Sequence, residues 1–291
     1  MERQRLEEIL TGFPKLKIAV VGDFFLDKWL EIDRSLDELS LETNLTAYQV
    51  TGKRCYAGAA GTVLSNLAAL EVGKLYALGF IGDDGEGFEM LRLLKARGID
   101  TENLFVSAEV MTPTYTKPVF RTENGIEETN RLDHRNVRLT PKSLERRIID
   151  SIWKIAPQVD GFIALDQLTS EGNGVLTPGV RQELAKVGDK YPNLVLYADS
   201  RAFIKHFHNM IIKCNNIEAI KLFDSTPIKI GNTGNTRENN SVEGAAKQDL
   251  REKASDIEEV KKCLLKLSDV TRRKVFISCG SKGIMVADEN E

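Results

Sequence analysis

The sequence has few of the side chains that build metal cages or disulfide frameworks. Its 291 residues include four cysteines and three histidines. The cysteines lie far apart and form no C-x-x-C pair, so their spacing matches neither a structural zinc site nor a small disulfide-rich scaffold. We expect reduced thiols, most of them buried, at Cys55, Cys214, Cys263 and Cys279.

Long apolar runs and blocks of one charge sign are lacking as well. No stretch approaches the roughly 20 apolar residues that cross a bilayer, and the start, MERQRLEEIL, is too charged for the core of a signal peptide. Forty basic and 43 acidic side chains give a net charge of -3, a poor match to nucleic acid or an anionic membrane. We therefore expect a cytoplasmic protein that binds neither nucleic acid nor membranes.

The dinucleotide fingerprint G-x-G-x-x-G is also missing. Its nearest match, AGAAGTVLSNLAAL, has Gly58 and Gly61 without the third glycine, and no short strand leads directly into it. An oxidoreductase with a nicotinamide cofactor is therefore disfavoured. Two interpretations of the cluster stay open: a ligand approaches the backbone at the start of a helix, or the helix simply packs closely.

What the sequence does contain is an alternation of strands and helices. Apolar runs that predict buried strands occupy residues 16–22, 75–81, 161–165 and 194–198. Helices are predicted at 86–97, after Thr140-Pro141, after Pro178 and at 257–267. In the first of these helices Phe88, Leu91 and Leu94 share one face, which we expect to be buried. The order predicts an α/β fold with a doubly wound, mostly parallel sheet.

Acidic residues recur where the predicted strands end. These residues are Asp23, Asp83, Asp166 and Asp199. Ligands of open parallel sheets bind at this edge, so the recurrence marks it as functional. A helix cap is an equal alternative for Asp166. Asp23 is expected to be only a polar residue at the rim of the sheet, where its strand ends.

Two further stretches carry information about the site. In VVGDFFLDKW the two aspartates, Asp23 and Asp27, are four residues apart, whereas an aspartyl-phosphate enzyme needs them two apart, which argues against a phosphatase of that kind. Residues 106–133 alternate polar and apolar side chains and include an Asn124-Gly125 hairpin signal. This segment predicts exposed antiparallel strands of the sort that cover a site.

The order of the motifs resembles a known family. It reads V-V-G-D-x-x-x-D-K, A-G-A-A-G before a helix, G-x-x-G-D-D-x-x-G, T-P-T-Y-T-K, R-L-D, A-D-S-R, N-N-I-E and S-C-G-S-K-G. The chain is thereby similar, from about residue 17 to 288, to the ribokinase-like (PfkB-type) carbohydrate kinases, and most similar to the domain that phosphorylates heptose 7-phosphate at the anomeric oxygen. The resemblance implies a sugar kinase that uses ATP and Mg²⁺.

The resemblance also implies a sugar site and a lid. Asp27 would hold sugar hydroxyls, as a carboxylate can, and Asp166 would lie near the sugar or the lid hinge; a solvated carboxylate is the alternative for Asp27. Segments of about 28–56 and 106–133 would form a β lid that excludes water and pairs with a second copy in a homodimer. The other residues assigned to the sugar or its phosphate are Gly58, Ala59, Gly61, Lys117 and Arg131, although exposed cations such as the last two are usually just solvated.

For the nucleotide, the resemblance points to the second half of the chain. Asn215 and Glu218 match the N-x-x-E element that organises magnesium and phosphate, with Glu218 meeting Mg²⁺ mainly through water. Ser278, Gly280 and Gly283 match the strand and turn that wrap the nucleotide.

The chain departs from the family pattern at two places. Ala57 and Gly61 stand where the family has glycine and asparagine, which leaves the identity of the sugar open. No G-A-G-D element, which carries the catalytic base and the anion hole of the family, follows the nucleotide turn. We expect residues 1–291 to be a single, incomplete kinase domain, a fragment with impaired or no catalysis; a natural binding or regulatory remnant is the alternative.

Overall fold

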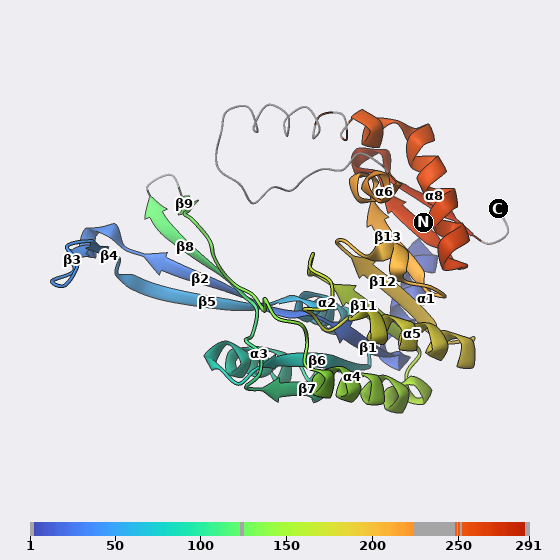
Figure 1. Ribbon diagram of the computed structural model, residues 1–291, viewed down its shortest axis with the longest axis horizontal. Coiled ribbons are helices and arrows are strands. Elements are labelled where there is room, and N and C mark those ends of the chain that lie inside the picture. The colour runs from blue at the N-terminus through green and yellow to red at the C-terminus, as the bar shows by residue number, and fades with distance from the viewer. Residues whose placement is uncertain (1–2, 123–124, 224–247, 249, 251, 289–291) are drawn as a thin grey trace. The chain divides into compact units, whose positions relative to one another are not determined.

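The computed structural model describes residues 3–122, 125–223, 248, 250 and 252–288 (Figure 1). The chain divides into two compact units, Met1–Val180 and Arg181–Glu291.

The first unit is built on four parallel strands in the order β11-β1-β6-β7. They are β1 (Lys17–Gly22), β6 (Lys74–Gly82), β7 (Asp100–Ser107) and β11 (Gly161–Asp166). Most residues of β1 and β6, four of six and seven of nine, are buried, as expected of strands covered on both faces. The strands predicted at 16–22, 75–81 and 161–165 are confirmed, and we call these four strands the main sheet of the first unit.

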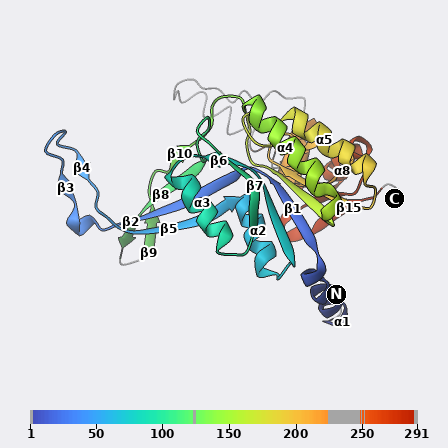
Figure 2. The same ribbon diagram turned by 90° about the horizontal axis from the view of Figure 1, so that it is seen from below.

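Helices cover both faces of this main sheet (Figure 2). They are α2 (Ala60–Ala69) and α3 (Gly85–Lys95) on one face and α4 (Lys142–Ile155) on the other. Val20 and Ala77 of the sheet share a core with Leu64 of α2 and Met90 and Leu94 of α3. The helix α1 (Arg3–Gly12) and the 3-10 turn η1 (Phe13–Lys15) precede β1, and η3 (Ala156–Gln158) follows α4.

The predicted buried face of α3 is wrong in one respect, because Phe88 is 72% exposed. A Cβ on Gly87 would lie 2.2 Å from the carbonyl oxygen of Gly82. Gly87 therefore lies on the buried face of α3. Met90 and Leu94, three and seven residues later, lie on the same face. Phe88 is rotated out of that face.

A second sheet of the first unit extends away from the main sheet (Figure 1). We call it the small sheet; its order is β10-β8-β2-β5, with β9 paired to β8. Its strands are β2 (Phe24–Ile32), β5 (Val50–Ala59), β8 (Thr114–Thr122), β9 (Gly125–Glu128) and β10 (Leu132–His134). The pair β3 (Glu38–Leu39) and β4 (Thr46–Ala47), preceded by the turn η2 (Arg34–Leu36), lies in the excursion between β2 and β5.

The antiparallel pairing predicted within residues 106–133 is confirmed, because β9 and β10 are both antiparallel to β8. The sequence did not predict that β8 also runs parallel to β2. The main-sheet strands β1 and β7 run in the same direction, and each leads into a strand of the small sheet. Those two strands, β2 and β8, therefore leave the main sheet in the same direction. The antiparallel partners of β8 are β9 and β10, and Asn124 of the hairpin signal lies outside the described residues.

The second unit repeats the α/β pattern. Its strands β12 (Val195–Ser200), β13 (Ile211–Asn215) and β14 (Val275–Ser278) are parallel neighbours, and β15 (Ile284–Ala287) is antiparallel to β14. The helices are α5 (Pro178–Lys190), which spans the boundary of the units, α6 (Asn216–Phe223) and α8 (Ile257–Thr271), with 3-10 turns η4 (Ile204–His206) and η5 (Gly280–Lys282). Residues 252–255 are helical as well.

All four cysteines are free thiols, as predicted, and three of them are buried. Burial raises the pKa of the Cys214 thiol to about 12, which makes it a poor nucleophile. Within the described part of the chain, no helix is long and apolar enough to cross a membrane.

Candidate active site

Asp27 lies on β2 of the small sheet, against the neighbouring strand β5. In the register of the two strands Asp27 is opposite Tyr56, and Phe25 is opposite Gly58. A Cβ on residue 58 would lie 2.6 Å from Oδ2 of Asp27, closer than real Cβ contacts allow. Glycine at position 58 therefore makes room for the carboxylate, and these two predicted site residues lie together.

Lys117 of β8 approaches Asp27 from the other side. Its Nζ lies 3.0 Å from Oδ1 of Asp27 and 4.8 Å from the centroid of the Trp29 ring. The two charged side chains are 19% and 27% exposed, so the pair is largely shielded from water while the carboxylate remains accessible. A half-buried carboxylate paired with a cation, which itself lies over an aromatic ring, matches the chemistry of a polyol, which offers both hydroxyls and an apolar face.

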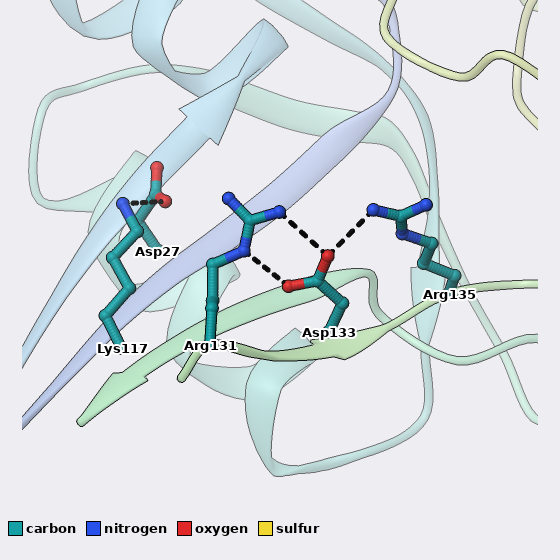
Figure 3. A network of polar contacts seen from close by, with 5 residues as sticks. All are labelled: Asp27, Lys117, Arg131, Asp133 and Arg135. Atoms are coloured by element: carbon teal, nitrogen blue, oxygen red, sulfur yellow. Dashed lines mark hydrogen bonds and ion pairs between the residues drawn. The ribbon is translucent and has the colours of Figure 1, made fainter. Parts of the chain in front are cut away.

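Arg131 lies on the same side of the small sheet as these residues and forms an ion triad with Asp133 and Arg135 (Figure 3). Nε and Nη2 of Arg131 donate to the two carboxylate oxygens of Asp133 at 2.6 and 2.9 Å, and Nη2 of Arg135 donates to Oδ2 at 2.7 Å. The hydrogen bond from Arg131 holds the pKa of Asp133 below its usual range. The guanidinium of Arg131 also lies over the ring of Tyr115 at 4.2 Å. The triad carries one net positive charge.

Sequence reasoning missed Trp29, Tyr115, Asp133 and Arg135. The first two lie on the face of Asp27 because side chains of a strand alternate, and Tyr115 is opposite Asp27 in the parallel pair. The spacing of two between Arg131, Asp133 and Arg135 was a usable signal, since it places all three on one side of an extended segment.

The glycine-rich loop divides into a strained residue and a packed one. Ala59 has φ 51° and ψ -118°, a left-handed conformation that costs about 1–3 kcal/mol for a residue with a Cβ, and it precedes the first residue of α2. Gly61 is buried inside the first turn of α2, where an added Cβ would lie 2.6 Å from the Cβ of Ala57. For Gly61 the geometry favours the close-packing interpretation.

Asp166 and Asp23 lie at the carboxyl edge of the main sheet of the first unit, and both are buried. The helix-cap alternative for Asp166 is wrong, because the next helix, α5, begins at Pro178 and its Val180 amide donates to Oγ1 of Thr177. The expectation that Asp23 is only a polar residue at the rim of the sheet is also wrong. Its side chain is 3% exposed, because backbone amides of a loop that the sequence pattern did not connect to it close over the carboxylate.

In the second unit, Asn215 and Glu218 form a reciprocal pair at the start of α6. The Asn215 amide donates to Oε2 of Glu218 and the Glu218 amide donates to Oδ1 of Asn215, both at 2.8 Å. This is a capping box, which satisfies two backbone donors of the first turn. The N-x-x-E spacing therefore has a structural use, and Oε1 is not part of this box.

Ser278 is opposite Asn215 in the parallel pair β13 and β14, so the two predicted nucleotide elements lie next to each other. The hairpin between β14 and β15 turns at residues 279–283, where the Cys279 amide donates to the carbonyl of Gly283 at 2.8 Å. Gly280 has φ 59° and Gly283 has φ 93° with ψ -143°. Both positions have open space where a Cβ would be, so the backbone of this turn is accessible.

A magnesium ion would find one predicted ligand here. Among the described residues no group of three or more His, Cys, Asp or Glu side chains is arranged to hold a metal. Mg²⁺ commonly keeps several waters and takes one or two protein carboxylates together with phosphate oxygens. The single carboxylate of Glu218 fits that mode and does not fit an all-protein metal cage.

Curated relatives of this chain are found among bacterial proteins. The bifunctional protein HldE of Helicobacter pylori (strain J99) is 27% identical over 203 residues, which cover 69% of this chain and 42% of that protein. HldE of Citrifermentans bemidjiense is 28% identical over 188 residues, covering 65% of this chain and 36% of that protein. The chain thus spans about two fifths of the length of the curated relatives it matches.

Solved structures of sugar kinases share the fold. Arabidopsis thaliana ribokinase complexed with ribose and ATP matches with a TM-score of 0.60 and 15% identity, covering 95% of this chain and 76% of that chain. Phosphofructokinase-2 from Escherichia coli in complex with fructose-6-phosphate matches with a TM-score of 0.57 and 13% identity, covering 95% and 78%. The predicted ribokinase-like α/β fold with a mostly parallel sheet is thereby confirmed.

A family model gives the assignment. The model described as pfkB family carbohydrate kinase matches residues 15–217, which is more than half of the chain. The match includes the small sheet, the residues around Asp27 and the start of the N-x-x-E element. The chain therefore belongs to the pfkB family of carbohydrate kinases, as its motifs predicted.

Proposed function

We propose that this protein is a sugar kinase that transfers the γ-phosphoryl group of ATP to a hydroxyl of a sugar or sugar phosphate. The observation that carries the proposal is the arrangement at Asp27. Gly58 leaves room for the carboxylate, Lys117 pairs with it, and the same Lys117 ammonium lies over the Trp29 ring. Family membership supports the reaction class.

The acceptor is a phosphorylated sugar, with heptose 7-phosphate favoured. Arg131, Arg135 and Lys117 supply three cations on one face of the small sheet, partly neutralised by Asp27 and Asp133. Guanidinium groups bind phosphate through paired hydrogen bonds. The motifs resemble the domain that phosphorylates heptose 7-phosphate, and together with the similarity to the bifunctional protein HldE this resemblance supports the same substrate class.

The second unit binds ATP and magnesium in this proposal. The open turn around Gly280 and Gly283 lets phosphate or base approach the backbone. Ser278 lies beside that turn, and Glu218 meets Mg²⁺ through water. The cation supplies neutralisation of the phosphate charge during transfer.

The small sheet acts as a lid and as a dimer surface. A lid that excludes water favours phosphoryl transfer to the sugar over hydrolysis of ATP. The excursion between β2 and β5, which contains the β3–β4 pair, exposes Leu39, Leu41 and Leu45, which are 68%, 101% and 70% exposed. Exposed apolar residues grouped in one segment are typical of contact surfaces. We expect Leu41→Asp to lower the mass measured by light scattering from dimer to monomer; a wild-type monomer would contradict the dimer.

Calorimetric titration with three acceptors tests the substrate. The panel contains heptose 7-phosphate, fructose 6-phosphate and unphosphorylated ribose, titrated into the wild-type chain and into Asp27→Asn. We expect binding of a phosphorylated sugar that the variant loses. No binding of any sugar, heptose phosphates included, would contradict the proposal.

Release of ADP tests the reaction separately. It is measured on the product of the complete open reading frame with the acceptor that binds best. Sugar-dependent ADP release is expected. Tight sugar binding without ADP release would instead favour a binding or regulatory protein.

A further inference from the structure

The chain crosses between the main sheet and the small sheet of the first unit at four places. Asp23 alone separates β1 from β2, and Ala59 leads directly into α2. Residues 108–113 join β7 to β8, and residues 135–141 join β10 to α4. Any motion of the small sheet relative to the main sheet must be accommodated at these crossings.

Hydrogen bonds connect the crossings in pairs. The Ala60 amide donates to the carbonyl of Asp23 at 3.0 Å, which joins the first crossing to the second. The Leu26 amide donates to the carbonyl of Pro113 at 2.8 Å, which joins the first strand of the sheet to the third crossing. Asn136 joins the third crossing to the fourth, because its side chain accepts from the Met111 amide and donates to the Met111 carbonyl, both at 2.9 Å.

The loop of residues 167–175 closes the ring. Thr140 of the fourth crossing donates through its amide to the carbonyl of Gly172 and through Oγ1 to the carbonyl of Gly174, at 2.8 and 2.7 Å. The same loop is bonded to the side chain of Asp23, which accepts from the amides of Val175 at 2.8 Å and Gln167 at 2.9 Å. The fourth crossing is thus tied back to the first through one carboxylate.

The loop of residues 167–175 packs closely against the carboxylate of Asp23. A Cβ on Gly174 would lie 2.5 Å from Oδ1 of Asp23, so glycine allows the loop to approach. Burial raises the pKa of Asp23, and the amides of Val175, Gln167 and Leu168 act in the opposite direction by bonding the carboxylate. A group so placed resists substitution even by its own amide, because an asparagine NH₂ would face backbone N–H donors.

We propose that Asp23 is a positioning residue that fixes the small sheet to the main sheet and thereby sets where Asp27, four residues further along the chain on β2, meets the acceptor. The consequence for the acceptor rests on the proposed function. The mechanical part does not, since the ring of hydrogen bonds exists without a ligand. The alternative is a purely local role, in which Asp23 holds only the loop of residues 167–175.

Amide hydrogen exchange on the free chain distinguishes the two roles. In Asp23→Asn, both roles predict exchange that is at least about tenfold faster at Gln167 or at Val175, since asparagine keeps one acceptor oxygen and presents NH₂ to the other amide. The positioning role alone also predicts faster exchange, by about threefold or more, at Met111 and Thr140, which do not touch Asp23. Exchange that stays at the wild-type rate at Met111 and Thr140 would overturn the proposal.

A second variant, at the opposite side of the ring of hydrogen bonds, tests the proposal even if Asp23→Asn does not fold. Asn136→Ala removes the link between the third and fourth crossings, and we expect faster exchange at Val175 in return. The matched control is Ile148→Val, a fully buried change in α4 outside the ring, which costs about 0.5–1.5 kcal/mol. If Ile148→Val gives the same exchange pattern as the ring variants, general destabilisation explains the result and the proposal fails.

Calorimetry connects the ring to the acceptor. With the acceptor that binds wild type best, Asp23→Asn is expected to bind about tenfold more weakly although Asp23 does not contact the sugar. Asp27→Asn is expected to weaken binding about 100-fold with no change of exchange at Met111 or Thr140. If the wild-type chain binds no sugar, the proposed function is contradicted, and the exchange experiment alone decides the role of Asp23. If Asp23→Asn binds the acceptor as tightly as wild type does, Asp23 does not position Asp27.

Discussion

The two units present their candidate sites in different ways. On the small sheet of the first unit the candidates are charged and aromatic side chains such as Asp27, Lys117 and Arg131, held by ion pairs. In the second unit the turn at residues 279–283 offers backbone groups and two glycines. Side chains can distinguish one acceptor from another, whereas a backbone turn recognises the phosphates and ring shared by many nucleotides. Acceptor choice should therefore depend on the first unit.

Removal of the Asp27 carboxylate is the strongest test of whether acceptor choice depends on the first unit. We expect Asp27→Asn to weaken acceptor binding about 100-fold, because a charged hydrogen bond is worth about 1.5–3 kcal/mol and a polyol makes up to two with this group. Calorimetric titration measures the change. Asp150→Asn, at an exposed carboxylate of α4, is the control and should bind like wild type. Equal losses in both variants would argue against a specific sugar contact.

In the second unit the largest effect is expected from backbone strain. Gly283→Ala should lower the free energy of unfolding by about 2 kcal/mol, since its φ of 93° with ψ -143° is accessible almost only to glycine. Gly280→Ala, at a left-handed φ of 59°, should cost about 1 kcal/mol. Urea denaturation measures both. Neither added Cβ would lie within 4 Å of another atom, so a steric clash does not contribute. If Gly280→Ala loses more stability than Gly283→Ala, backbone strain is not the cause.

A finer distinction within the first site concerns the phosphate of the acceptor. Arg131→Ala should weaken binding of a phosphorylated sugar about tenfold and leave binding of the unphosphorylated sugar unchanged, because only the former offers an anion. Titration with the two sugars side by side measures the difference.

Asp133→Asn is the companion variant for this prediction. It removes the carboxylate that Arg131 and Arg135 now bind, so affinity for the phosphorylated sugar should rise. A fall in affinity would mean that Asp133 orients the arginines more than it competes with the phosphate.

The smallest effect is expected where the small sheet contacts α3. Nζ of Lys28 lies 2.9 Å from Oε1 of Glu86, and this bond lowers the pKa of Glu86 from its ordinary value of 4.5. A lowered carboxyl pKa contributes stability that is present above 4.5 and is lost as the pH falls through the folded-state pKa. Lys28→Met should cost less than about 1 kcal/mol at pH 7 and progressively less as the pH falls below 4.5. Thermal unfolding across this range measures it; a cost independent of pH would point to packing.

Local pattern was sufficient to predict the strands β1, β6 and β11, because a strand buried on both faces must be apolar throughout. The same holds for α4, whose Ile148 and Ile152 recur at helical spacing. Site residues that are adjacent to a motif, such as Asp27 and Gly58, could likewise be found from order alone.

What could not be predicted depends on contacts between distant segments. The burial of Asp23 follows from amides at Gln167 and Val175, more than a hundred residues later, which no local pattern announces. The parallel pairing of β2 with β8 depends on the direction in which β7 returns through the main sheet. The spacing of Arg131, Asp133 and Arg135 groups these residues, but only the register of β8 and β10, which sets Asp133 opposite Tyr115, places them on the face of Asp27.

The register of the small sheet has a consequence for the order in which the chain folds. β2 and β5 are joined by their own excursion, so Asp27 and Gly58 can meet early through a comparatively local pairing. Lys117 can join them only after β6, α3 and β7 have returned the chain to the beginning of β8. Closing that longer loop costs more chain entropy before any contact repays it. A newly made chain should therefore hold the carboxylate of the candidate sugar site before the cation that orients it.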